Sequence, residues 1–284
     1  SVVNAKAFSD LLTSQIVDVA HDKHLLVTYS SEVIASNPTG ERKLTPGPDL
    51  AARMAKKNCA FYKVERLSGN VGYLKFDKFQ DAEFCGPTVA AAMAFLANTD
   101  SLIIDLREND GGSPAMVALV ASYLFSGNPP VHLNDIERRK EGTTDFEIRQ
   151  FWTLPYVPGQ RYMGKEVYIL TSSVTFSGAE EFTYDLQTLK RATIVGELTG
   201  GGANPGNTHR LGDHFAAFIP NGRAINPVTK TNWEGIGIKP DIAVPQQDAL
   251  KAARRTALEH LIAKAPDEEQ LRALKQALTD VDAE

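Results

Sequence analysis

The chain has 284 residues, and its 30 lysines and arginines against 35 aspartates and glutamates give a net charge of −5. A hydrophobic fraction of 43% and a charged fraction of 23% are ordinary for a globular protein with one large or two smaller domains. No basic stretch is long enough to follow a nucleic-acid backbone, and no run of about 18 apolar residues predicts a membrane span. The first residue is Ser1 rather than Met, which predicts a processed or trimmed chain.

The first third of the chain is predicted to hold a helix, a strand, a loop and a hairpin. Apolar residues at helical spacing predict a helix over residues 5–20, and "HLLVTYS" (24–30) predicts a strand. Segment 30–50 is rich in proline, glycine, serine and charge, which indicates a loop. Two alternating segments, 59–67 and 70–79, are separated by a Ser-Gly pair and predict a β-hairpin.

From about residue 86 the pattern changes to strands that alternate with helices. The predicted helices are 86–98, 113–125 and 177–190, and the predicted strands are 101–107, 166–171 and 192–197. This alternation indicates βαβ units and a largely parallel core sheet, so the predicted fold class is α/β.

Three regions stand outside that alternation. Residues 132–160 form a charged insertion that we expect to be irregular. The segments "HFAAFIP" (214–220) and "GRAIN" (222–226) meet at Asn221-Gly222 and predict a second hairpin. From Asp248 onward the pattern predicts a charged amphipathic helical tail.

The chain has two cysteines, Cys59 and Cys85, which are 26 residues apart in unrelated local patterns. They form no metal-ligand spacing. We expect buried or free thiols rather than a disulfide.

Ser177 lies in "TSSVTFSGAEEF" (171–182), where a buried strand turns into a helix. The sequence "SGAE" fits a capping box, in which the serine hydroxyl accepts from the third helical N–H and Glu180 reaches back. The same turn would place the hydroxyl beside unpaired N–H groups and the positive end of a helix dipole, as a nucleophile in acyl transfer requires. The two interpretations are compatible.

A second turn, in "LIIDLRENDGGSPA", also joins a buried strand to a helix. Gly111 and Gly112 allow positive φ and close backbone approach, so their N–H groups could form an oxyanion hole with that of Gly178. The alternative is an ordinary strand-to-helix turn. Asp105 and Arg107 are expected to form a structural pair.

A serine nucleophile needs a base, and the chain has six histidines. We discount His260, in the tail, and His132, in the insertion. His24 lies where a loop enters a strand, which suits a ring that points into a cleft. His21 is a rival, and spacing alone does not choose between the two.

Three ordered segments, "SLIIDLRENDGG", "VYILTSSVTFSGAEEFTYDLQTLKRATIVGELTGGG" and "TNWEGIGIKPDI", resemble the core of the C-terminal-processing (tail-specific) serine peptidases. The similarity is greatest to the branch of interphotoreceptor retinoid-binding protein and the tricorn protease core. The resemblance implies a ClpP/crotonase-like ββα core. It also implies no PDZ domain, because the space between "TYSS" and "CAFYKV" is too short. The implied divisions are an N-terminal helical or α+β subdomain (1–66), the core (67–250) and a helical tail (251–284).

The resemblance also implies roles for individual residues. Ser177 corresponds to the nucleophile. The lysine base of the tail-specific branch falls on Gly202, 25 residues after the serine, so the Ser/Lys dyad is missing. The tricorn-like branch instead takes a histidine from the N-terminal region, which corresponds to His24, and a glutamate from the "NWEG" segment, which corresponds to Glu234.

Two positions depart from that branch. Lys23 stands before the histidine where the branch has a serine through which its glutamate acts. Glu234 is then expected to reach His24 directly or through water, or to pair with Lys23 instead. Asn204 stands where relatives tend to carry a histidine.

The predicted function is peptide-bond cleavage through a Ser177 acyl-enzyme, with His24 as general base and Glu234 as orienting carboxylate. The resemblance implies a peptide or protein substrate, no metal or organic cofactor, and a periplasmic or secreted location; a homo-oligomer stays open. The alternatives are a non-catalytic carrier of a retinoid or fatty acid on the same fold, and a degenerate scaffold that does neither. Residues 33–50 and 132–160 are candidates for substrate selection by position alone.

Overall fold

The computed structural model describes residues 4–34, 48–140 and 142–283. Most of the predicted loop 30–50 lies outside this part of the chain. The end of that loop was predicted wrongly, because a helix, α2 (Pro48–Lys56), begins there. Among the described residues, no helix has both the length and the apolar content that a bilayer crossing requires.

The centre of the molecule is a six-stranded sheet in the order β12-β8-β7-β4-β3-β2. From β3 to β12 every neighbouring pair is parallel, and β2 joins β3 antiparallel as the predicted hairpin. The predicted largely parallel α/β core is therefore confirmed. The strands are β2 (Phe61–Leu67), β3 (Val71–Phe76), β4 (Ser101–Asp105), β7 (Glu166–Thr171), β8 (Thr193–Gly196) and β12 (Ile242–Ala243).

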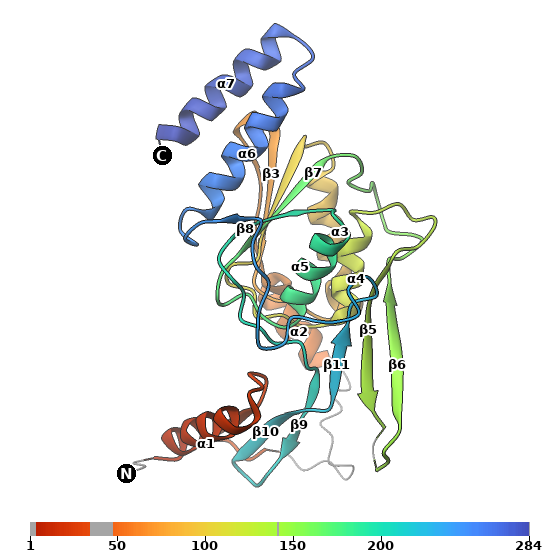
Figure 1. Ribbon diagram of the computed structural model, residues 1–284, viewed down its shortest axis with the longest axis vertical. Helices are drawn as coiled ribbons and strands as arrows, with labels where there is room; N and C mark the ends of the chain where they lie inside the picture. Colours follow the sequence, from red (N-terminus) through yellow and green to blue (C-terminus); the bar gives the residue numbers. More distant parts are fainter. Residues whose placement is uncertain (1–3, 35–47, 141, 284) are drawn as a thin grey trace.

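Helices cover both faces of this sheet (Figure 1). Along β4, Leu102 and Ile104 pack in the cluster that includes α3, α4 and α5, while Ile103 packs in the cluster that includes α6 and α7. A strand that is buried on both faces reads as a continuous apolar run, which is why "LII" carries no alternation. The helices are α3 (Ala82–Leu96), α4 (Pro114–Ser122), α5 (Gly178–Thr188), α6 (Ala249–Ala263) and α7 (Glu268–Ala283).

Residues 4–34, here called the N-terminal arm, form a separate unit at the end of the molecule away from α6 and α7 (Figure 1). The arm consists of α1 (Ala5–Ala20) and β1 (Leu26–Tyr29), both predicted from the sequence. Strand β1 pairs antiparallel with β10 (Phe215–Pro220), which pairs with β9 (Gly206–Arg210). This pairing brings residues near position 24 beside a segment almost 200 positions later in the chain.

The predicted hairpin over residues 214–226 is wrong in its pairing. Both strands exist, but β11 (Gly222–Ile225) pairs with β5 (His132–Arg139) and not with β10. The N–H groups of Asn221 and Gly222 both donate to the Pro205 carbonyl, so this dipeptide sends the two strands into different sheets and does not close a turn.

The insertion is also more regular than predicted. Strand β5 pairs with β6 (Phe146–Trp152), so residues 132–160 contain a β-hairpin that forms a three-stranded sheet with β11. Its strands were missed because their charged residues hide the two-residue alternation.

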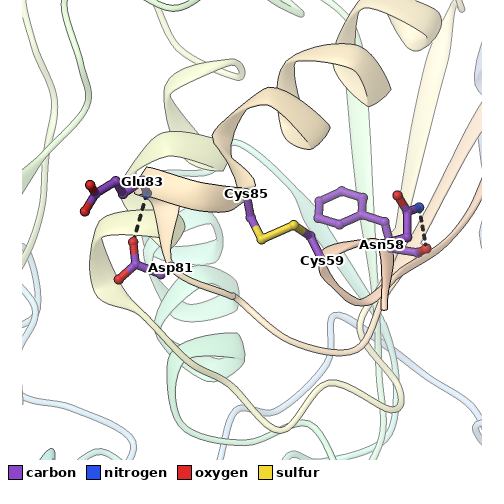
Figure 2. Close-up of a disulfide and its surroundings, with 6 residues drawn as sticks. Asn58, Cys59, Asp81, Glu83 and Cys85 are labelled. Atoms are coloured by element: carbon purple, nitrogen blue, oxygen red, sulfur yellow. Dashed lines mark hydrogen bonds between the residues drawn. A yellow bond between two sulfur atoms is a disulfide. The ribbon is translucent and has the colours of Figure 1, made fainter. Parts of the chain in front are cut away.

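The two cysteines form a disulfide, and the prediction of buried or free thiols was wrong (Figure 2). Cys59 lies in the turn before β2, and Cys85 lies in the first turn of α3, with 5.6 Å between their Cα atoms. Helix α3 begins where Asp81 accepts the N–H of Glu83 at 2.8 Å. The pair joins two elements that only tertiary packing brings together, so local patterns held no sign of it.

Candidate active site

Ser177 lies on a sharp turn between β7 and α5. Its backbone has φ 52° and ψ −121°, a conformation that residues other than glycine rarely adopt. The carboxylate of Glu180 accepts the Ser177 N–H at 2.9 Å, so the Glu180 half of the predicted capping box is present. The turn places Ser177 at the N-terminus of α5, at the carboxyl edge of the parallel sheet, as in the nucleophile elbows of hydrolases.

Glu180 does more than cap the helix. Its buried carboxylate also accepts the N–H groups of Gly201 and Gly202, at 2.7 and 2.9 Å, and the hydroxyl of Thr199 at 2.5 Å. The Glu180 side chain therefore links the turn at Ser177 to residues 199–202. The capping motif predicted the first of these contacts, and nothing in the sequence predicted the others.

The Gly-Gly turn lies directly against the serine turn. A Cβ on Gly111 would be 2.6 Å from the Gly178 nitrogen, and a Cβ on Gly178 would be 2.9 Å from the Gly112 nitrogen. The Gly111 N–H is already used, because it donates to Asn109 Oδ1 at 2.9 Å. Within the described part of the chain, the N–H groups of Gly112 and Gly178 donate no hydrogen bond, so these two are available to an oxyanion.

Asn109 holds the two turns together and was missed by the sequence reasoning. Its fully buried side chain donates to the Phe76 carbonyl at 2.9 Å and accepts from Gly111. Its own carbonyl accepts the N–H of Phe176, the residue before the serine, at 3.1 Å. The only signal in the sequence was an amide side chain two positions before a Gly-Gly pair.

The predicted pair of Asp105 and Arg107 is confirmed. The Arg107 guanidinium donates to both carboxylate oxygens of Asp105, at 2.9 and 2.6 Å. Tyr73 donates its hydroxyl to the same carboxylate at 2.6 Å. These groups stabilise the end of β4 and are not among the residues that line the cavity described next.

A cavity of about 690 Å³ opens between the arm and the core. Ser177, Gly112 and Gly178 line it from the two turns, and His24 and Lys23 line it from the arm. The structure therefore brings the predicted nucleophile, the predicted base and two of the three predicted oxyanion glycines to one cavity, whereas Gly111 and Glu234 are not among its lining residues.

His24 lies with its side chain only 9% exposed, between aromatic rings. Its ring centroid is 4.6 Å from that of Phe176 and 6.0 Å from that of Phe218. Neither ring nitrogen has a hydrogen-bond partner among the described residues. Burial lowers the pKa of His24, and the nearby Asp22 opposes that shift. A neutral imidazole with free nitrogens is suited to accept a proton.

The rival histidine lies elsewhere. His21 is exposed, has φ 56° at the C-terminus of α1, and donates its N–H to the Val17 carbonyl at 2.8 Å. It is not among the residues that line the cavity.

Gly202, the position of the lysine in the tail-specific branch, has no room for a side chain. A Cβ there would overlap the ring of Phe176 and lie 2.7 Å from Cε1 of His24. The space beside residue 202 is therefore filled by the histidine that we consider as the base and by the aromatic ring packed on it.

Glu234 lies close to His24, and so does Asp22, which the sequence reasoning did not single out. One ring nitrogen of His24 and one carboxylate oxygen from each acid lie within 4.8 Å of one another. Glu234 Oε2 accepts the Ala203 N–H at 2.5 Å, while Oε1 is buried without a partner among the described residues. Burial raises the pKa of Glu234, against the hydrogen bond from Ala203. The only hint of Asp22 was its place in "HDKH".

Lys23 and Asn204 fasten the turn that carries His24. Lys23 donates its ammonium to the Gly200 carbonyl at 2.5 Å, and the ion pairs of the described residues include none between Lys23 and Glu234. Asn204 donates its amide to Asp22 Oδ2 at 2.9 Å, and Asp22 Oδ1 accepts the His24 N–H at 2.9 Å. The arm is thus linked to the loop at 200–204 by direct polar contacts.

Known proteins resemble this chain in sequence and in fold. The model of "Peptidase family S41" matches residues 70–244. A carboxy-terminal-processing protease of Bartonella bacilliformis is 26% identical over 188 residues, which cover 64% of this chain and 40% of that protein. The chain therefore spans well under half the length of this curated relative.

Two solved structures share the fold. The photosystem II D1 C-terminal processing protease aligns with a TM-score of 0.50 at 19% identity, over 79% of this chain and 49% of that one. A lipoprotein from Streptococcus agalactiae aligns with a TM-score of 0.57 at 15% identity, over 90% of this chain and 83% of that one. The family match covers more than half of the chain and confirms the resemblance found in the sequence: this chain belongs to peptidase family S41.

Proposed function

We propose that the chain cleaves peptide bonds through an acyl-enzyme on Ser177, with His24 as general base and Glu234 as orienting carboxylate. The observation that carries this proposal is the shared cavity: a serine on a strained turn and a buried histidine with free nitrogens both line it. The rest of the machinery follows from groups already described around these two side chains.

In the proposed reaction, Ser177 Oγ attacks the carbonyl carbon of the scissile peptide while His24 takes its proton. The negative charge that develops on the carbonyl oxygen is bound by the N–H groups of Gly112 and Gly178, each worth about 3 kcal/mol in the transition state. His24 then returns the proton to the leaving amine. Water, deprotonated by the same imidazole, releases the acyl group.

The carboxylates beside His24 stabilise the imidazolium that forms in each step. Glu234 and Asp22 both lie within 4.8 Å of a ring nitrogen, a distance at which an opposite charge favours the protonated ring. Glu234 acts directly after a small rotation or through a water. Lys23, which is directed to Gly200, leaves this carboxylate free for the role.

A histidine rather than a lysine serves as base in this proposal, because Gly202 supplies no amine and its surroundings are filled. The proposal includes a ClpP/crotonase-like core at residues 67–250 without a PDZ domain, an N-terminal subdomain at 1–66 and a helical tail at 251–284. The proposed substrate is a peptide or protein. The Cys59–Cys85 disulfide supports a periplasmic or secreted location, since disulfides persist in oxidising compartments.

Labelling with a fluorophosphonate tests the nucleophile. We expect the wild-type chain to be labelled on Ser177, Ser177→Ala to lose the label, and Ser173→Ala to keep it, since Ser173 is an exposed serine in the same turn. Peptide mapping of the adduct identifies the residue.

Full labelling of Ser177→Ala would remove this serine from the mechanism. If the wild-type chain is not labelled and its fluorescence changes on addition of a retinoid or fatty acid, the result would contradict the peptidase and favour the carrier of apolar ligands.

A further inference from the structure

Three side chains with metal-ligand chemistry meet where the N-terminal arm touches the core. A ring nitrogen of His24 and a carboxylate oxygen from each of Asp22 and Glu234 lie within 4.8 Å of one another. Two of these residues come from one turn of the arm, and the third comes from the loop before β12. The cluster exists only because β1 pairs with β10 and brings the arm against the core.

Two of the three side chains in this cluster, His24 and Glu234, have donor atoms that are unused. Both ring nitrogens of His24 and Oε1 of Glu234 are buried and have no hydrogen-bond partner within residues 4–34, 48–140 and 142–283. A buried polar atom without a partner costs about 1–3 kcal/mol. The side chain of His24 is more than nine-tenths buried. The unpartnered atoms of His24 and Glu234 are therefore suited to a ligand that brings positive charge.

The charges around the cluster favour a cation. Asp22 and Glu234 place two carboxyl groups beside the imidazole of His24. Lys23 is adjacent in sequence, but its ammonium is directed to the Gly200 carbonyl. A divalent cation would offset the repulsion between the two carboxylates.

Hydrogen bonds from neighbouring groups also hold the two carboxylates in place, and they leave lone pairs on the carboxylate oxygens available to a metal ion. Asp22 accepts from the backbone of His24 and from the amide of Asn204, both at 2.9 Å. Glu234 accepts from Ala203 through Oε2 and leaves Oε1 free. Hydrogen bonds of this kind orient the ligands of metal sites before the ion arrives.

We propose that Asp22, His24 and Glu234 bind a divalent cation of the zinc class, and that the bound ion switches the peptidase off. One imidazole and two carboxylates with an open position suit Zn²⁺, whereas Ca²⁺ and Mg²⁺ prefer six or more oxygen ligands. Ligand atoms about 2.1 Å from an ion lie roughly 3.4 Å apart in tetrahedral geometry, so small side-chain rotations close the observed spread.

The switch rests on the proposed function, while the binding does not. A neutral imidazole has a single lone pair. An ion on the ring nitrogen that faces the carboxylates takes that lone pair and leaves the proton on the other nitrogen, which then cannot accept the proton of Ser177, so metal binding and acylation exclude each other. The ion is an inhibitor in this account and takes no part in the reaction.

Calorimetry on the metal-free full chain tests the site, with Zn²⁺ as the titrant and the visible absorption of Co²⁺ as a report on coordination. Glu234→Gln and Asp22→Asn are nearly isosteric and remove ligand charge with little change of shape. His132→Gln is the matched control, because His132 Nε2 also lies 2.6 Å from a carboxylate, that of Asp135. We expect binding to weaken at least about tenfold in the first two variants and to stay unchanged in the control.

Equal zinc affinity in the wild type and in Glu234→Gln would contradict the proposed metal site. A loss of zinc affinity in His132→Gln would contradict it as well. Fluorophosphonate labelling of the wild type, with and without saturating Zn²⁺, tests the switch: we expect a slowing of at least about tenfold that EDTA reverses. An unchanged labelling rate would overturn the switch. A wild type that fails to label without zinc would count against the proposed function and would leave the binding result as it stands.

Discussion

The core and the N-terminal arm bring their residues to the cavity in different ways. In the core, Leu102, Ile103 and Ile104 are fully buried in the strand that leads to the Gly-Gly turn. In the arm, Ser9 is the buried residue of α1, while Phe8 and Val19 are 42% and 83% exposed. The candidate nucleophile therefore belongs to a part of the molecule with many buried side chains, and the candidate base is carried by a segment with few.

This difference separates two kinds of defect. The serine turn is held by buried hydrogen bonds from Glu180 and Asn109, so changes there are expected to reduce stability and activity together. The arm is held by β1 and by contacts such as those of Lys23 and Asn204, so changes there are expected to reduce activity while the core stays folded.

The largest effect is expected from a methyl group in the Gly-Gly turn. In Gly112→Ala the new Cβ would overlap the Phe79 carbonyl oxygen at a residue with φ +139°, so we expect a loss of about 3 kcal/mol or more in unfolding free energy. Displacement of the proposed oxyanion donor should slow labelling of Ser177 at least about 100-fold. Thermal melts and labelling rates measure the two effects.

Gly159→Ala is the matched control, because Gly159 has φ +84° and no atom of the described residues would lie within 4 Å of a new Cβ. Its cost should be limited to backbone strain of about 1 kcal/mol. Equal melting temperatures for both variants would contradict the close packing of Gly112 against the Phe79 carbonyl.

A smaller effect is expected from the buried carboxyl group of Glu181, which lies on the core side of the cavity. Burial raises the pKa of Glu181 to about 7, whereas an unfolded glutamate titrates near 4.3. Between these values the folded chain holds a proton that the unfolded chain releases, so the unfolding free energy falls as the pH rises through this window, by on the order of 3 kcal/mol. Glu181→Gln should flatten the dependence of melting temperature on pH.

Asp185, whose pKa burial also raises, is expected to keep part of that slope. Glu83→Gln, which changes an exposed glutamate of α3, serves as the control and should follow the wild-type curve. Parallel curves for Glu181→Gln and the wild type would show that the Glu181 carboxyl is hydrated.

The smallest effect tests how the ring of Phe176 fills the space beside Gly202. Gly202→Ala should cost about 1–3 kcal/mol because its Cβ would overlap the ring of Phe176. Combined with Phe176→Ala, that cost should largely disappear, so the double variant should be more stable than the two single losses predict. Chemical denaturation of all three variants measures the coupling, and strictly additive losses would contradict the packing described.

The core was predictable from the sequence because its signals are local. The alternation of strands and helices follows from apolar periodicity, and the serine turn follows from a motif within a few residues of Ser177. The strand partners of β10 and β11 were not predictable, because the preference of Asn-Gly for hairpin turns is local. The Pro205 carbonyl, which accepts the N–H groups of both residues, is not part of that local pattern.

The site was predictable only as far as its motifs reach. Ser177 and the glycines were located by pattern, and His24 and Glu234 by resemblance, and the roles of all of them stay proposals. Asp22 and Asn109 were missed because their partners lie far away in sequence or on the backbone. The Cys59–Cys85 disulfide was missed for the same reason, since its halves meet only after β2 and α3 pack.

The central claim is that a serine of the core and a histidine of the arm act as one unit. The most direct measurement compares the fluorophosphonate labelling rate of Ser177 in the wild type, His24→Ala and His21→Ala, with melting temperatures recorded alongside. The account predicts a loss of at least about 100-fold in His24→Ala and no loss in His21→Ala, with the core still folded in both. Equal losses in the two variants, or a wild-type rate in His24→Ala, would contradict it.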